Sequence, residues 1–269
     1  MKKTLILLTL ILNLTIAQNN TDDFLNHLNT YQFNNSSGGG YLYSFDYRYD
    51  GGYVVVGART NIFFIDSDGN IISQQNLGGS DLVSISQTSD SNYIIGRHSS
   101  GYNVDLVKMN GDESGALWSV NVGSMGMVGK IIEDSNGNYF LPGGKKPGCC
   151  GGTWDALNVS LDANGSSNWS DVYCIRCGTN VSANGDEIAT SSVDVGDGVI
   201  SVGYIGVGGT GSYGQTDGFI IKYDYSGNRV WEKIHGTSDN YSSFTEVKTT
   251  SDNNLILTGY YVDTDQTMI

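Results

Sequence analysis

Short apolar segments recur along the chain, and each one follows a turn rich in aspartate, asparagine and glycine and ends near a glycine. Five copies of this phrase occupy residues 50–57, 90–96, 136–143, 196–203 and 252–259. Their first residues are separated by 40, 46, 60 and 56 positions, so the spacing varies while the phrase is kept. Asparagine and glycine supply the positive φ of tight hairpin turns, and the apolar run suits a strand. The pattern predicts an internal repeat made of strands.

A second phrase alternates with the first and predicts the turn between two further strands. Its copies occupy residues 66–72, 110–118, 162–169 and 224–231, and three of them end in tryptophan. In the second repeat we therefore expect four strands, at residues 82–88, 93–98, 103–109 and 116–122. Polar and apolar residues alternate along Val104–Met109, which is typical of a strand with one buried face.

Four antiparallel strands per repeat of roughly 40–45 residues form one blade of a β-propeller. The predicted fold class is therefore an all-β propeller of four-stranded antiparallel blades. Four repeats are complete, and strands near 243–249 and 255–261 begin a fifth, so the chain holds about four and a half blades. One blade alone cannot bury both of its faces, so neighbouring blades must stack.

Composition agrees with this fold class and limits the partners. The 269 residues include 37 glycines and 25 asparagines, which disfavour helix interiors and exclude a helical bundle. Hydrophobic residues make up 39% of the chain, with 17 tyrosines, which is enough apolar surface to exclude wholesale disorder. The formal net charge of −14 argues against nucleic acid or an anionic membrane as the main partner.

Residues 1–17 have the features of a secretory signal peptide. Lys2 and Lys3 precede an apolar run at residues 4–16, and the small residue Ala17 follows it. The run is too short for a comfortable membrane span, and no later apolar stretch approaches that length. We expect cleavage near Ala17, a secreted or cell-surface protein without a membrane span, a polar linker at residues 18–40, and propeller repeats at residues 41–269.

The repeats resemble those of a known group of exported proteins. The phrases concerned are Gly-Gly-Tyr-Val-Val-Val-Gly at 51–57, Asp-Gly-Phe-Ile-Ile-Lys-Tyr-Asp-Tyr-Ser-Gly-Asn-Arg-Val-Trp at 217–231 and Ile-His-Gly-Thr at 234–237. They resemble the secreted β-propeller repeat proteins that Gram-negative bacteria export through the type nine secretion system. The resemblance covers roughly residues 41–261 and implies the fold and export. It implies little about activity, because members of this group mostly lack a defined one, and the C-terminal sorting domain that many of them carry is not seen here.

The repeats do not complete a ring. The fifth repeat has two strands before Ile269, and residues 18–40 are polar and make a poor replacement strand. An open sheet edge is a liability for aggregation. We therefore expect a truncated chain from a protein of six or more blades. The alternative is a closed ring of five blades, completed by residues 23–33 or by an oligomer.

All four cysteines lie in the third repeat, at Cys149, Cys150, Cys174 and Cys177. In an exported protein they indicate two disulfides, and the two loops that hold them open on one face of an up-and-down blade. A zinc site fits the Cys174-x-x-Cys177 spacing, but the adjacent pair Cys149–Cys150 does not suit it. A disulfide between Cys149 and Cys150 is the third possibility. We expect disulfides, with no metal and no cofactor.

Cations and aromatic residues gather in loops on that same face. The expected ligand-binding residues are Arg97, Tyr102, Lys145, Lys146, Trp154 and Arg176. Aromatic rings beside cations can hold a glycan or an anionic polymer, while a plain solvated rim is the alternative. The tryptophans Trp118, Trp169 and Trp231 stand at equivalent positions of their repeats, and we expect them to pack between blades.

These features predict a secreted, non-enzymatic binding or adhesion module whose partner is an extracellular glycan or a surface protein. We expect no catalytic residues, because the three histidines are scattered and no nucleophile or phosphate-loop motif occurs. One alternative is an extracellular enzyme acting on polysaccharide, which would need paired carboxylates in a cleft. Another is a structural spacer repeat within a larger surface protein.

Overall fold

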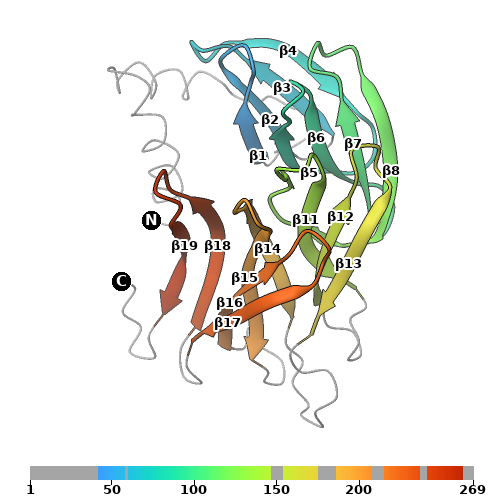
Figure 1. Cartoon of the computed structure of the whole chain (residues 1–269). Coiled ribbons are helices and arrows are strands. Elements are labelled where there is room, and N and C mark those ends of the chain that lie inside the picture. The colour runs from blue at the N-terminus through green and yellow to red at the C-terminus, as the bar shows by residue number, and fades with distance from the viewer. Residues whose placement is uncertain are drawn as a thin grey trace.

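The computed structural model describes residues 42–57, 60–146, 154–174, 186–207, 215–236 and 241–262. These residues form strands β1 to β19, arranged in sheets that follow one another around an arc (Figure 1). Among them, no helix has the length and apolar character needed to cross a membrane. Residues 1–41 lie outside the described ranges, so the signal peptide and the linker stay predictions.

The sheets are named blades 1 to 4 and half-blade 5, in chain order. Blade 1 comprises β1 (Leu42–Tyr47), β2 (Tyr53–Gly57), β3 (Asn61–Ile65) and β4 (Ile71–Asn76). Blade 2 comprises β5 (Leu82–Gln87), β6 (Tyr93–His98), β7 (Asn103–Met109) and β8 (Ala116–Ser124). Blade 3 comprises β9 (Met127–Val128), β10 (Ile132–Glu133), β11 (Tyr139–Lys145), β12 (Asp155–Leu161) and β13 (Ser167–Tyr173). Blade 4 comprises β14 (Glu187–Asp194), β15 (Val199–Val207), β16 (Gln215–Tyr223) and β17 (Arg229–His235), and half-blade 5 comprises β18 (Tyr241–Thr249) and β19 (Leu255–Val262).

Within each blade the strands pair antiparallel in the order of the chain. The four strands expected in the second repeat are β5 to β8, with boundaries within two residues of the predicted ones. The first strand of blade 3 is split into β9 and β10, both of which pair with β11. The prediction of an all-β propeller with about four and a half blades is confirmed.

At three of the four junctions between neighbouring blades, the first, inner strands of the two sheets are joined by the same kind of hydrogen bond. A serine hydroxyl on one inner strand accepts the backbone N–H of the next inner strand. The three bonds are Ile85 N to Ser44 Oγ (3.3 Å), Ile131 N to Ser84 Oγ (3.1 Å) and Val247 N to Ser191 Oγ (3.3 Å). Because these strands belong to different sheets, the serines satisfy backbone donors that no strand ladder can reach.

The tryptophans of the second phrase pack between blades, as the sequence predicts. The Trp169 ring lies 5.6 Å from Phe140 of its own blade and 5.3 Å from Tyr223 of blade 4. Its Nε1 donates a hydrogen bond of 3.1 Å to Tyr225 O, also in blade 4. Trp118 and Trp231 pack in the same way against the buried clusters shared with blade 3 and half-blade 5.

In two of the Asp-x-x-Gly turns, the glycine makes room for the tryptophan of the preceding blade: Gly165 for Trp118 and Gly227 for Trp169. Gly227 has φ +88°, and a Cβ atom there would lie 2.6 Å from the Trp169 ring. Gly69 holds the same place in the turn of blade 1 and has the same φ of +88°, but a Cβ atom there would meet nothing within 4 Å. Glycine is therefore required twice at position 227, for the turn and for the packing.

This difference predicts unequal costs for two equivalent substitutions. Gly69→Ala should lower the free energy of unfolding by about 1–2 kcal/mol, because only the left-handed backbone is strained. Gly227→Ala should lower it by roughly 1–3 kcal/mol more, because the new methyl group also displaces Trp169. Urea denaturation of the two variants measures the difference. Equal losses of unfolding free energy in the two variants would show that the packing of Trp169 does not require glycine at position 227.

Candidate functional site

The ends of the strands that flank the two cysteine-bearing segments lie together at one end of blade 3. Asp155 begins β12, Cys174 follows β13 and Glu187 begins β14, yet their ligand atoms all lie within 4.8 Å of one another. The start of β12, the end of β13 and the start of β14 therefore meet at one end of the blade, while the segments between them lie outside the described residues.

Three of the predicted ligand-binding residues meet on this face, at the junction of blades 2 and 3. Lys146 Nζ lies 5.4 Å from the ring centroid of Tyr102 and 5.0 Å from that of Trp154. The two rings stand edge to face, with centroids 5.4 Å apart and planes at 89°. We name Tyr102, Lys146 and Trp154 the aromatic–lysine cluster.

The end of β8 and the turn after it contact this cluster through two hydrogen bonds and one close packing contact. Ser124 Oγ donates to Lys146 O at 2.7 Å, and Met125 N donates to Tyr102 O at 2.8 Å. A Cβ atom on Gly126 would lie 2.1 Å from the tryptophan ring, so only glycine lets the ring approach this backbone so closely. The short segment Ser124–Gly126 therefore holds the main chain of two cluster residues, through the Ser124 hydroxyl and the Met125 N–H, and packs against the third.

Trp154 is also tied to blade 4. Its N–H donates to Asp186 Oδ1 at 2.9 Å, and its carbonyl accepts the N–H of Glu187 at 2.8 Å. Tyr102 is 49% exposed, so the cluster is fixed from the blade side and open on the other side. Contacts within the protein therefore position both rings.

The other predicted ligand-binding residues have different positions. Arg97 donates to Asp105 Oδ2 of blade 2 at 2.9 Å and to Leu77 O, in the connection from blade 1, at 2.7 Å. Lys145 is exposed at the end of β11, next to the cluster. Arg176 lies outside the described residues, so its part in the site stays a prediction.

Of the four cysteines, Cys174 alone lies among the described residues. Cys149, Cys150 and Cys177 lie outside the described residues, so their pairing stays a prediction. Cys174, Asp155 and Glu187 form a group with the proximity of metal ligands, but all three already take part in other interactions. Asp155 and Glu187 are only 1% and 3% exposed, so this carboxylate pair does not present the open acid and base that a glycosidase needs.

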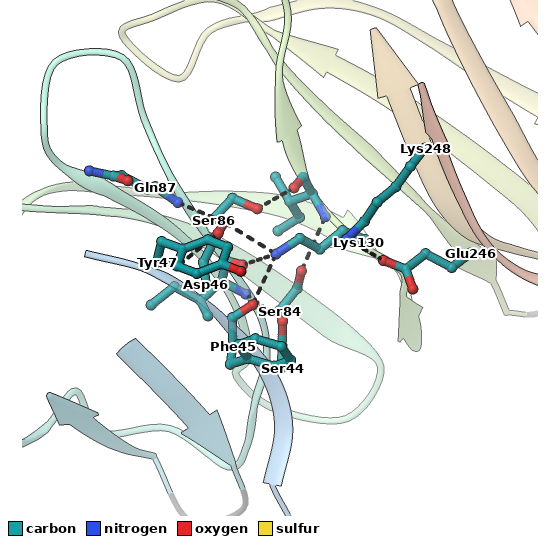
Figure 2. Close-up of polar contacts among 12 residues, drawn as sticks. Ser44, Phe45, Asp46, Tyr47, Ser84, Ser86, Gln87, Lys130, Glu246 and Lys248 are labelled. Atoms are coloured by element: carbon teal, nitrogen blue, oxygen red, sulfur yellow. Dashed lines mark hydrogen bonds and ion pairs between the residues drawn. The ribbon is translucent and has the colours of Figure 1, made fainter. Parts of the chain in front are cut away.

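A second polar cluster lies where the inner strands converge, around Lys130 (Figure 2). Lys130 Nζ donates to Ile85 O at 2.6 Å and to Phe45 O at 3.3 Å, and it lies 3.4 Å from Asp46 Oδ2. The same Asp46 oxygen accepts the N–H of Gln87 at 3.1 Å. One side chain from blade 3 therefore joins the inner strands of blades 1 and 2.

The backbone of Lys130 reaches blade 4 as well. Its N–H donates to Thr190 O at 3.0 Å, and its carbonyl accepts the Ser192 hydroxyl at 3.0 Å. Burial lowers the pKa of the Lys130 ammonium, while the Asp46 carboxylate opposes that shift. The charged groups of Glu246 and Lys248 on β18 complete this cluster, with their own ion pair at 3.2 Å (Figure 2).

Our sequence reasoning missed Lys130, although the repeats contain a signal for it. Aligned through their pairing with the second strand, the inner strands carry Ser44, Ser84 and Ser191 at one shared position. In blade 3 this position is occupied by Lys130, and in half-blade 5 by Glu246. A charged residue at a position where other repeats carry serine therefore distinguishes the inner strands of blade 3 and half-blade 5 from the others.

Lys130 is predicted to hold β1 to its neighbours. Lys130→Met removes three contacts and leaves two carbonyls and a carboxylate less satisfied, but it also removes the cost of burying the ammonium. We expect a net loss of about 1–2 kcal/mol in unfolding free energy and faster amide exchange in β1. Lys248→Met is the matched control, because the Lys248 side chain is 70% exposed, and it should change stability by less than about 0.5 kcal/mol. Urea denaturation and hydrogen exchange test both variants, and equal effects would contradict the role of Lys130.

The fold is similar to solved structures at low sequence identity. A protein of unknown function from Bacteroides caccae shares 11% identity, with a TM-score of 0.51, over 87% of this chain and 81% of its own. The structure titled Dos1 propeller shares 10% identity, with a TM-score of 0.54, over 88% of this chain and 59% of its own. Hydrazine synthase from Kuenenia stuttgartiensis shares 11% identity, with a TM-score of 0.54, over 87% of this chain and 66% of its own.

At this level of identity the similarity concerns the fold alone. The sequence matches no protein-family model and no curated protein. This chain spans less than two thirds of the length of the Dos1 and hydrazine synthase chains. The sheet order and these similarities together show that the chain has a β-propeller fold.

Proposed function

We propose that this protein is a secreted β-propeller module that binds an extracellular glycan or cell-surface polymer and has no catalytic role. The proposal rests on one observation. An ammonium group and two aromatic rings, brought from two blades, meet at a partly open surface. Export is proposed from residues 1–17 and from the resemblance to propellers of the type nine secretion system.

The aromatic–lysine cluster has the chemistry to hold a sugar. The apolar C–H face of a pyranose packs on aromatic rings, and Tyr102 and Trp154 present rings in two perpendicular planes. Lys146 and the exposed Lys145 add positive charge beside them. A carboxylate or sulfate group on the sugar would pair with these ammonium groups, so an acidic polysaccharide fits better than a neutral one.

The two lysines stand out because the protein as a whole is acidic. At −14 overall, the molecule repels an acidic polymer at long range. Binding would therefore depend on the two lysines at the contact itself. A rigid ring of blades that presents loops on one face is the usual way in which a propeller displays such a site.

Substitutions in the aromatic–lysine cluster test the proposal. Trp154→Ala and Lys146→Ala should each weaken binding to polygalacturonate about tenfold, which corresponds to about 1.4 kcal/mol. Lys146→Ala should leave any binding to neutral dextran unchanged, because only the charge contact is lost. Affinity electrophoresis with each polymer in the gel measures both effects.

The chain supplies a matched control for the lysine substitution. Lys233 Nζ lies 5.9 Å from the ring centroid of Trp231, so Lys233→Ala removes a cation beside a tryptophan on another blade. It should leave polymer binding unchanged. The assignment of the site would be contradicted if Lys233→Ala weakened polymer binding as much as Lys146→Ala does. It would also be contradicted if none of the three substitutions changed the affinity for the polymer.

A further inference from the structure

A cation and an anion are both held next to Trp154. At the junction with blade 2, the Lys146 ammonium lies 5.0 Å from the centroid of the Trp154 ring. At the junction with blade 4, the exposed Asp186 carboxylate accepts the Trp154 N–H through Oδ1 at 2.9 Å. The aromatic–lysine cluster therefore has a positive charge on one side of Trp154 and a negative charge on the other.

Hydrogen bonds of the backbone fix Asp186 at this place. Its carbonyl accepts the N–H of Gly206 at 2.7 Å, which joins it to β15, and the N–H of the next residue, Glu187, donates to Trp154 O at 2.8 Å. Asp186 is therefore held between blades 3 and 4. A carboxylate can accept about four hydrogen bonds, so the one from Trp154 leaves room for donors of a ligand.

Tyr204 of β15 lies close to the same carboxylate. Burial, and after it the negative charge of Asp186, raises the pKa of the Tyr204 hydroxyl to about 12. The half-buried Tyr204 therefore stays neutral and offers a hydroxyl beside Asp186. Sugar hydroxyls donate to a carboxylate and exchange hydrogen bonds with a phenol, whereas a sugar carboxylate would be repelled by Asp186. This place suits an uncharged sugar.

Both charges beside Trp154 are available to a ligand. Among the described residues, neither Lys146 nor Asp186 takes part in an ion pair. Arg97 differs, because it is paired with Asp105 at 2.9 Å. A polymer that crosses Trp154 from blade 2 toward blade 4 would therefore meet an unpaired ammonium first and an unpaired carboxylate next.

We propose that Asp186 is a specificity-determining residue, which selects a polysaccharide whose acidic sugar is followed by an uncharged one. This inference rests on the proposed function, because it places the acidic sugar at the aromatic–lysine cluster. That sugar pairs with Lys146, and the next sugar lies beside Asp186 and Tyr204, where its hydroxyls donate to the carboxylate. A polymer with a charge on every sugar brings a second carboxylate toward Asp186, and the repulsion weakens its binding.

Asp186→Asn tests this assignment, because it removes the charge and keeps an oxygen that can accept the Trp154 N–H. Titration calorimetry of the full chain compares two polymers. Polygalacturonate is charged on every sugar, whereas hyaluronate alternates glucuronate with uncharged N-acetylglucosamine. The substitution should strengthen binding to polygalacturonate about threefold and change binding to hyaluronate by less than about 1.5-fold. The gain should shrink as the salt concentration is raised.

Asp112→Asn is the matched control. The Asp112 carboxylate is also exposed and accepts a backbone N–H, from Ser114 at 2.8 Å. It lies in the turn between β7 and β8, at the opposite end of blade 2 from the loop that carries Tyr102. The net charge of the protein changes by the same amount in both variants. We expect Asp112→Asn to change the affinity for either polymer by less than about 1.5-fold.

The outcomes separate this inference from the proposed function. Suppose that Lys146→Ala and Trp154→Ala weaken binding while Asp186→Asn changes neither polymer, or changes both equally. The aromatic–lysine cluster then binds the polymer, and the role of Asp186 is wrong. If the Lys146 and Trp154 variants also bind like the parent, the proposed function and this inference are both overturned. Because the expected effect of Asp186→Asn is tighter binding, a misfolded variant cannot imitate it.

Discussion

Each blade carries apolar side chains on both faces of its sheet, and only a neighbouring blade can cover them. One buried cluster joins Val54 and Phe64 of blade 1 to Ile85 and Tyr93 of blade 2, and similar clusters fill the next three junctions. The core of this protein is therefore a series of junctions between sheets. The arc, the inner-strand serines and the tryptophans all follow from this need for coverage.

The candidate sites lie where these junctions reach the surface. The aromatic–lysine cluster takes one residue from blade 2 and two from blade 3, so the stacking of two sheets decides its geometry. Lys130 lies at the inner end of the same junctions and contacts strands of three other blades. In both places a charged lysine is held by groups that come from different sheets.

The same constraint acts in half-blade 5. Ile256 is 55% exposed there, whereas the residues at the same repeat position in the other blades, such as Val54 and Ile94, are buried. Solved structures that share only 10–11% sequence identity with this chain have a similar fold.

The strands and turns could be predicted because their causes are local. Alternation along Val104–Met109 and the left-handed glycines of the turns depend on neighbours within a few residues, so the second repeat was placed within two residues of its observed strands. The packing role of Trp169 was also predictable, because a tryptophan recurs at this position in three of the four copies of the second phrase.

Contacts between blades could not be predicted in this way, because they depend on how sheets stack. Lys130 contacts Phe45 O across 85 positions of sequence, and the contact between Trp154 and Tyr102 spans two blades. Both loops could be placed on one face, but only the tertiary structure decided that Lys146 stacks on both rings while Arg97 is paired within blade 2. Sequence therefore determined the repeat, its strands and its turns, whereas the stacking of the blades decided which side chains meet.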